Sequence, residues 1–590
     1  MRRLPPATRK WQPACARAAW TPPACPIPAR GKAAAAFGAL LASAVPAQGW
    51  AQAGGLAPAT GLDDASVNGV RSALDSYQRS PPPRAVGPNW QVSPSLGVDV
   101  GVTDNAYRVA SPRRADVFTL ITPSVVVNGD TAHIQANAAY SPVISVYANN
   151  SSQTRIDQFG QAGALVTFIP DTLFLDLRGS VSESSLTGGF GTADQRGFNR
   201  NNQVTTLALS ATPYVQRRFG GWGTGLLSYN ISQTLQDTPY GNTLAVNGNG
   251  GLPAFYGSSG NLTTQRERGL FTTGENLGRV NNVTELSATQ YDGSGSYRGA
   301  FRNEATNTTS YALTRAVSVS GTIGYQNLHY AGFPPYNVDQ PEWRLGGRYA
   351  PSPNLNLGLS YGRRDGFNDF AADGSWFPTA RTALFASYTT GLTSTAEDYQ
   401  NTLQTTSVGP AGQLTNRTTG APVQGTTGFF GTQNNIFQLR RLSVSGLLSY
   451  DRDSFSVTVS NEQRTSVNQA AANAGTGVVP AGTNTNGTFG SVSWGHTLSD
   501  RLSSTVIASY GVNDNGNALG LGSGSQTSFS GAASLNYIFT PTLTGRVVYT
   551  HTEVTGAGNG FNGGGFNSFG SFVSGTYTEN ALLAGLRKSF

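Results

Sequence analysis

Four histidines are the side chains of this sequence best suited to metal binding or acid–base catalysis, namely His133, His329, His496 and His551. No two of them have the spacing of a metal-ligand pair, and neither an HExxH nor a Cys-x-x-Cys motif occurs. A membrane phospholipase would need a serine beside a histidine, and nothing close in sequence to His133 or His551 marks a nucleophile. The sequence therefore predicts no enzyme, no metal site and no cofactor.

Charged residues at alternate positions are the second candidate for chemistry. Asp176 and Arg178 are two residues apart, and in a β-strand that spacing puts both side chains on one face. The polar strand faces predicted in this way carry Asp99, Asp176, Arg178, Arg344, Arg348, Glu462, Arg464, Arg546 and Arg587. Two interpretations remain open. The charges attract and sort polar or anionic solutes, or they pair across neighbouring strands and fill the space between them.

The elements that must position these charges are β-strands. Apolar and polar residues alternate through most of residues 91–590, as in the segment 92–103. The alternation restarts near residues 91, 116, 131, 154, 172, 203, 222, 261, 280, 294, 316, 341, 354, 367, 380, 435, 454, 487, 501, 526, 541 and 575. This pattern predicts about 22 strands, with about 20 to 24 compatible, each long enough to cross a bilayer at a tilt.

The connections between these strands alternate in length. Short turns are expected at 128–130, 170–171, 218–221, 351–353, 451–454, 499–501 and 540–542, and long Gly/Asn/Ser/Thr-rich loops at 184–202, 234–262, 394–434, 466–486, 512–526 and 555–571. Short periplasmic turns and long extracellular loops are typical of outer-membrane barrels. A soluble β-solenoid would show a short regular repeat, which is absent from the sequence. The expected fold is all-β, a transmembrane antiparallel up-and-down β-barrel whose first strand pairs with its last, because hydrocarbon tolerates no open sheet edge.

The final strand carries a candidate assembly signal. Residues 577–590 alternate between apolar and polar side chains and end in an aromatic, Phe590. In barrels of this class the signal has a glycine five residues before the terminal aromatic, and Gly585 matches it. Lys588 departs from the apolar residue expected two positions before the end, and we interpret it as a side chain that reaches to the membrane interface.

The net positive charge of the chain comes from its N-terminal leader. Residues 1–53 hold seven basic residues and no acidic one, which equals the whole formal charge of +7. A nucleic-acid partner is therefore not expected. Residues 33–45 form an apolar run too short to span a bilayer, and Ala51-Gln52-Ala53 is a small-x-small site, so we predict a signal peptide at 1–53 with cleavage after Ala53. Both cysteines lie within it. Residues 54–90 form an expected periplasmic lead-in with a Pro-rich linker, and residues 91–590 form the barrel.

Aromatic residues recur near the predicted strand ends. They fit the interfacial girdles of a membrane protein, with stacking against a sugar as the alternative use. The set comprises Trp343, Tyr361, Trp376, Tyr388, Tyr450, Trp494, Tyr510, Tyr537 and Tyr549.

Three stretches, residues 93–129, 172–191 and 343–367, carry SPSLGVDVGVTDN, TLFLDLRGSVSESS and WRLGGRYAPSPNLNLGL motifs. With the overall layout they make the chain resemble the outer-membrane β-barrel family associated with PEP-CTERM and exosortase loci, which lie beside exopolysaccharide genes. The resemblance covers most of residues 90–590. It implies an outer-membrane barrel that serves envelope polysaccharide, and it carries no residue-level activity.

Two functions follow as expectations. The first is a pore or an export and transport component for polar solutes, with exopolysaccharide as the solute that the resemblance implies. The second is a structural or adhesive barrel whose long extracellular loops bind a partner, with no open channel. A TonB-dependent receptor would need a large plug domain before its first strand, where only residues 54–90 stand. The expected location is the outer membrane of a Gram-negative bacterium. The expected partners are lipid, lipopolysaccharide, the barrel-assembly machinery and polysaccharide-export proteins.

Overall fold

The computed structural model describes residues 89–185, 196, 203–237, 261–332, 334–408, 414–416, 431–432, 435–468, 484–514, 525–556 and 576–590. The predicted signal peptide and nearly all of the predicted lead-in lie outside these residues. So do parts of every predicted long loop.

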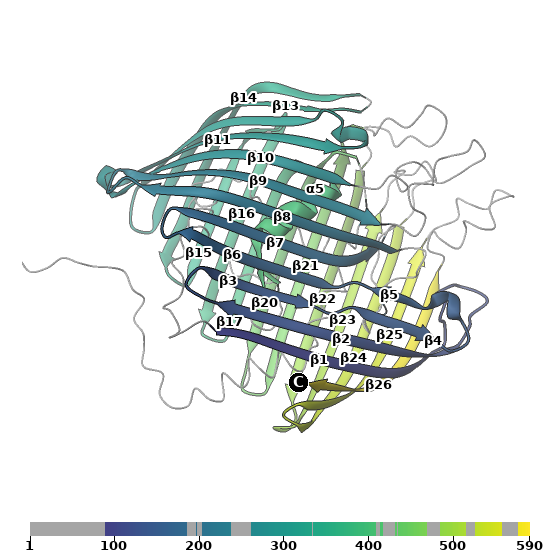
Figure 1. Cartoon of the computed structure of the whole chain (residues 1–590). Helices are drawn as coiled ribbons and strands as arrows, with labels where there is room; N and C mark the ends of the chain where they lie inside the picture. Colours follow the sequence, from purple (N-terminus) through teal and green to yellow (C-terminus); the bar gives the residue numbers. More distant parts are fainter. Residues whose placement is uncertain are drawn as a thin grey trace, which may run out of the picture.

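The described residues form one antiparallel β-barrel (Figure 1). Its strands are β1 (Asn89–Thr103), β2 (Asp116–Asp130), β3 (Ile134–Tyr140), β4 (Val143–Tyr147), β5 (Arg155–Asp157), β6 (Gly160–Ile169), β7 (Leu173–Ser185), β8 (Gln203–Arg218), β9 (Gly223–Asp237), β10 (Leu262–Thr273), β11 (Val280–Gly293), β12 (Phe301–Ala312), β13 (Val317–Tyr330), β14 (Tyr336–Ser352), β15 (Leu355–Arg364), β16 (Phe367–Thr379), β17 (Thr382–Thr393), β20 (Phe437–Ser449), β21 (Asp453–Ser466), β22 (Asn484–Thr497), β23 (Leu502–Asp514), β24 (Ser525–Thr540), β25 (Leu543–Gly556) and β26 (Tyr577–Ser589).

Two of the barrel strands are interrupted. β3 and β4 both pair with β2 and together form one barrel strand. β5 pairs with β4 and β6 pairs with β3, so β5 and β6 together form the next barrel strand. The 24 segments therefore make 22 barrel strands, as the alternation of the sequence predicts. The largest errors in the predicted starts are at β12, expected near 294, and β14, expected near 341.

The barrel closes between its first and last strands. β1 and β26 are antiparallel, with Val98 opposite Leu586, and the Phe590 amide donates to the Pro94 carbonyl at 3.0 Å. Closure pairs the edge groups that hydrocarbon would leave unsatisfied.

All connections at one end of the barrel are short, and every long loop lies at the other end, where the connections 294–300, 331–335 and 365–366 are also short. This difference orients the short-turn end toward the periplasm. One predicted turn is displaced, because residues 128–130 still belong to β2 and the chain reverses at 131–133.

The two faces of the wall differ as the alternation requires. On β1, Val98 and Val100 are 40% and 52% exposed on the outside, whereas Asp99 between them is 2% exposed inside. The outer face presents apolar side chains to the surroundings, while the inner one is mainly Ser, Thr, Asn, Gln and charged residues. All nine aromatic residues proposed for girdles lie on outward strand positions or in short turns.

The predicted loop at 394–434 is wrong in one respect, because it contains the helix α5 (Thr395–Thr405), followed by a small hairpin of β18 (Thr406–Val408) and β19 (Leu414–Asn416). Short 3-10 turns also occur at η1 (Ser151–Gln153), η4 (Glu275–Leu277) and η5 (Gly295–Tyr297). Among the described residues, no helix has the length and apolar character needed to cross a membrane.

Candidate functional site in the barrel lumen

Helix α5 lies inside the barrel, between its walls (Figure 1). The helix begins at Ser394, whose side chain accepts from the Glu397 amide at 3.2 Å. A serine three residues before a glutamate is the sequence signature of a helix start. This signal was available in the sequence, but the surrounding Thr- and Gly-rich composition favours a loop.

One side of α5 rests on β7, β8 and β9. Tyr399 and Leu403 pack against Ala208 of β8, forming a small apolar cluster. Hydrogen bonds surround it: Thr234 donates to the Ala396 carbonyl at 3.1 Å, and the Gln404 amide donates to Asn230 at 3.2 Å. Ala396, at the start of the helix, also belongs to a larger apolar cluster with Leu262 and Ile436. The helix is therefore held by polar contacts together with these two apolar clusters.

Arg178 of β7 holds the C-terminal end of the helix. Its guanidinium donates to the carbonyls of Leu403, Gln404 and Thr406 at 3.1, 3.1 and 2.8 Å. Asp176 fixes the same guanidinium by two further hydrogen bonds of 2.8 Å. A cation at this end complements both the unpaired carbonyls and the helix dipole.

The other side of α5 reaches a charged cluster on β20 and β21. Asp398 lies 3.2 Å from the Arg441 guanidinium, which pairs with Glu462 at 2.6 Å, and Glu462 pairs with Arg464 at 2.6 Å. All four side chains are buried. Burial raises the pKa of Asp398 to about 6, against the opposing effect of Arg441.

The helix thus joins distant parts of the wall. β8 is the sixth and β20 the sixteenth of the 22 strands, so their contacts with α5 come from nearly opposite sides. Within the described residues, α5 occupies the space between them.

The predicted charges all take inward strand positions, and they lie in pairs or clusters. Asp99 pairs with Arg546 at 2.7 Å, and Arg344 pairs with Asp369. Arg348 is attracted by Asp373, and Arg587 is attracted by Asp99 and repelled by Arg546. These charges therefore form a cross-strand network, with Asp176, Arg178, Glu462 and Arg464 connected to the helix.

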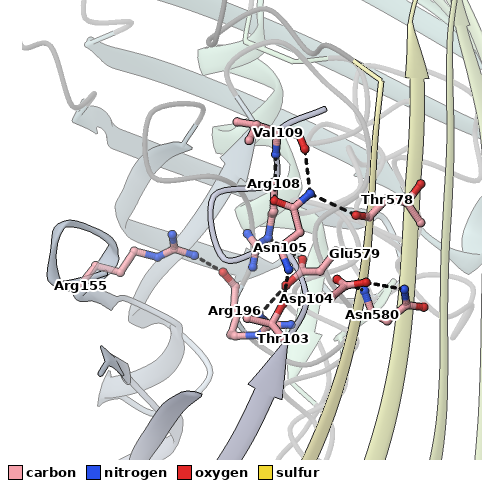
Figure 2. A network of polar contacts seen from close by, with 10 residues as sticks. All are labelled: Thr103, Asp104, Asn105, Arg108, Val109, Arg155, Arg196, Thr578, Glu579 and Asn580. Atoms are coloured by element: carbon pink, nitrogen blue, oxygen red, sulfur yellow. Dashed lines mark hydrogen bonds and ion pairs between the residues drawn. The ribbon is translucent and has the colours of Figure 1, made fainter. Parts of the chain in front are cut away.

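A second polar network closes the seam between β1 and β26 at the loop end (Figure 2). Glu579 is 1% exposed and accepts from Thr103 at 2.7 Å. It also pairs with Arg108 at 2.8 Å and with Arg196 at 2.6 Å. Asp104 accepts two hydrogen bonds from Asn580. Segments far apart in sequence are thereby tied to the last strand.

Burial of the inner wall changes along the barrel axis. On β2 the inward side chains Phe118, Leu120 and Thr122 are buried near the loop end, whereas Ser124 and Val126, toward the turn end, are half-buried. The lumen along this strand is packed toward the extracellular side and more accessible from the periplasmic side.

A recess of about 500 Å³, counted together with the solvent open to it, lies on the wall from β10 to β15. Its lining carries both signs of charge, including Arg266, Glu285, Glu304, Glu342 and Arg344. Glu342 is 5% exposed, and neither of its carboxylate oxygens accepts a hydrogen bond from the described part of the chain.

The described ranges hold no group of three or more His, Cys, Asp or Glu residues suited to a metal ion. His496 contacts Asp453, which also accepts from Trp494, and His551 contacts Asn580, which also accepts from Tyr549 and donates to Asp104.

Several lumen residues were not predicted. Arg441 and Glu579 occupy inward positions that a longer reading of the alternation would have reached. Asp398 lies on α5, and no strand pattern could place it. Gly585 and Phe590 have structural contacts, but their assembly role remains a prediction.

The barrel is closed, has 22 strands and presents an apolar outer face. These features identify the chain as an outer-membrane β-barrel protein of the Gram-negative type. No protein-family model matches the sequence, and neither does any curated protein.

Solved structures give weak similarity over most of the chain. The siderophore receptor PirA from Acinetobacter baumannii is 10% identical, with 85% of this chain and 80% of that chain covered and a TM-score of 0.42. The FrpB iron transporter from Neisseria meningitidis is 9% identical, with coverage of 84% and 81% and a TM-score of 0.44. The ferric-catecholate import receptor Fiu from E. coli K12 is 11% identical, with coverage of 84% and 81% and a TM-score of 0.41. Similarity this low carries no argument about function.

Proposed function

We propose that this protein is a conduit for polar solutes across the outer membrane, with α5 as a displaceable obstruction of its lumen. The observation that carries the proposal is how the helix is held. Its attachments include hydrogen bonds and ion pairs to a polar wall, through Arg178 and Arg441 among others. Water can replace contacts of this kind when the helix moves, whereas an apolar core would resist exposure. Barrels of this strand number usually enclose a plugged lumen.

The chemistry of the wall favours a polar, hydroxyl-rich solute. The recess from β10 to β15 offers arginine donors next to carboxylate acceptors, and Glu342 has two acceptor oxygens without a hydrogen bond in the described residues. Sugar hydroxyls both donate and accept, so they can satisfy both kinds of group. An exopolysaccharide is the solute in keeping with the sequence resemblance, and it is part of the proposal.

A flux assay in proteoliposomes tests this function. Protein purified from outer membranes should admit neutral and anionic oligosaccharides, and Glu342→Gln should alter the relative rates while leaving folding intact. Arg381→Ala is the matched control, because Arg381 is an exposed charge in a short turn outside the lumen. The proposal fails if a folded barrel excludes every polar solute, including after α5 is released.

A structural or adhesive barrel is the second candidate. The tight network around Glu579 and the occupied lumen favour it, since an anchor needs neither an exit path nor a moving part. Under that function, shortening the loops 234–262 and 394–434 would abolish partner binding, and no variant would conduct.

A further inference from the structure

The outer wall is apolar around most of its circumference, whereas on β10, β11 and β12 amides and a carboxylate stand among the outward apolar residues Phe271, Leu286 and Tyr311. Outward positions on these three strands carry Gln265, Glu267, Asn282, Gln290, Asn303 and Asn307, a group that we call the polar outer patch. These six side chains point out of the barrel, because residues at the alternate positions, such as Val283, Thr308 and Ser310, are buried on the lumen side. On the adjoining β9 and β13, Leu227 and Ile323 are 65% and 69% exposed at equivalent outward positions.

Glu267 lies near the middle of its strand. It is opposite Tyr229 on β9 and Ala288 on β11. Tyr229 stands between the outward residues Leu227 and Ile231, so Glu267 is level with the apolar band. It is exposed, and no ion-pair partner for it occurs in the described part of the chain. A carboxylate that faces hydrocarbon at this depth is unfavourable.

Amide side chains beside it form a ladder. Asn282 and Asn307 exchange hydrogen bonds of 2.9 and 3.0 Å, and Asn307 also donates to Thr284 at 2.9 Å. The patch is therefore partly satisfied within one chain. Gln290 and Asn303 make no hydrogen bond to the described residues and remain available on its border.

We propose that the polar outer patch is the contact surface for a second copy of this chain within the membrane. Carboxamides both donate and accept, so two identical patches can pair with each other. A two-fold axis would set Glu267 of each copy against amides of the other and remove it from lipid. Outward amides also occur on β21 and β22, where Asn461 donates to Asn486 at 3.2 Å, and what sets the polar outer patch apart from them is the Glu267 carboxylate at the depth of the apolar band. One self-complementary patch suffices for a two-fold contact.

Cysteine cross-linking tests the contact in intact membranes, because both native cysteines precede residue 54. We expect Asn303→Cys to give a cross-linked dimer under mild oxidation or with a short bis-maleimide. Val100→Cys is the control, since Val100 is 52% exposed on the outside of β1, away from the patch and from the outward amides of β21 and β22. Cross-links at both positions would indicate random collision and overturn the proposal. A cross-link at Asn303→Cys to a species of another size would identify a different partner and would also overturn it.

A second measurement uses native mass spectrometry of the full protein in mild detergent. The wild type should be dimeric, and Glu267→Leu should raise the dimer dissociation constant at least tenfold, because it removes the carboxylate that the contact takes out of lipid and sets against amides. An unchanged or lower dissociation constant would contradict the proposal. If Glu267→Leu does not fold, Asn303→Leu serves in its place. A monomer at all protein concentrations, together with no cross-link in membranes, would contradict the proposal.

Discussion

Asp99 and Arg546 form a two-pronged ion pair, with both N–O distances at 2.7 Å, although they lie on β1 and β25 with β26 between them. The residue of β26 opposite both is Gly585. A Cβ on Gly585 would be 2.1 Å from the Asp99 carboxylate and 2.5 Å from the Val98 carbonyl oxygen. The missing side chain is what lets the pair cross the closing strand.

Gly585→Ala should therefore weaken barrel closure. The added methyl must displace Asp99 or the β1 backbone, and overpacking of this kind costs about 1–3 kcal/mol. The measurement is the urea midpoint of the heat-modifiable band in lipid. Gly391→Ala is the matched control, because open space surrounds that position in β17. Equal midpoints for the two variants would contradict the close approach at Gly585.

Arg178→Ala should increase ion conductance. The change removes three hydrogen bonds to the C-terminal carbonyls of α5. Since hydrogen bonds to charged groups contribute about 1.5–3 kcal/mol each, even one of them shifts the balance between bound and released helix by roughly tenfold or more. Single-channel recording measures the open probability. An unchanged open probability would show that Arg178 does not retain the helix.

Asp398 should make the obstruction dependent on pH. Its pKa of about 6 in the docked helix exceeds the ordinary value of an aspartate near 3.9, so docking favours the protonated form. Docking is then strongest below pH about 4 and weakens as the pH rises through about 6. Conductance should rise between these values, and Asp398→Asn, which resembles the protonated form, should stay low and lose the pH dependence. A rise that persists in Asp398→Asn would assign the effect to another group.

Glu579→Gln should release the loop that follows β1. The substitution leaves Arg108 and Arg196 without their buried carboxylate, and loss of one partner from a buried ion pair costs about 3–5 kcal/mol. Trypsin cleavage after the exposed Arg113 or Arg114 should become faster. Glu553→Gln on β25 is the control, because Glu553 is exposed. Similar cleavage rates in both variants would argue against the network in Figure 2 as a fastening of this loop.

The sequence predicts the strands of the barrel wall well, but it predicts the side-chain pairs and the helix inside the lumen poorly. A strand between lipid and a polar lumen must alternate, so residues such as Asp99 and Arg546 are placed by parity alone. Their pairing across β26 depends on Gly585 and on the register of three strands, which single-strand patterns do not encode. The position of helix α5 in the lumen depends on its contacts with β8 and β20, which are ten strands apart. In the sequence, only the Ser394–Glu397 capping pattern indicates that a helix begins here.

The most direct test of the conduit is single-channel recording of two proteins, the wild type and a variant with residues 395–405 replaced by a Gly/Ser segment of equal length. Both should remain heat-modifiable, because α5 contributes no strand to the barrel. The account predicts small or rare openings for the wild type and large, steady steps for the variant. Silence from a correctly folded variant would contradict it and would favour an anchoring role.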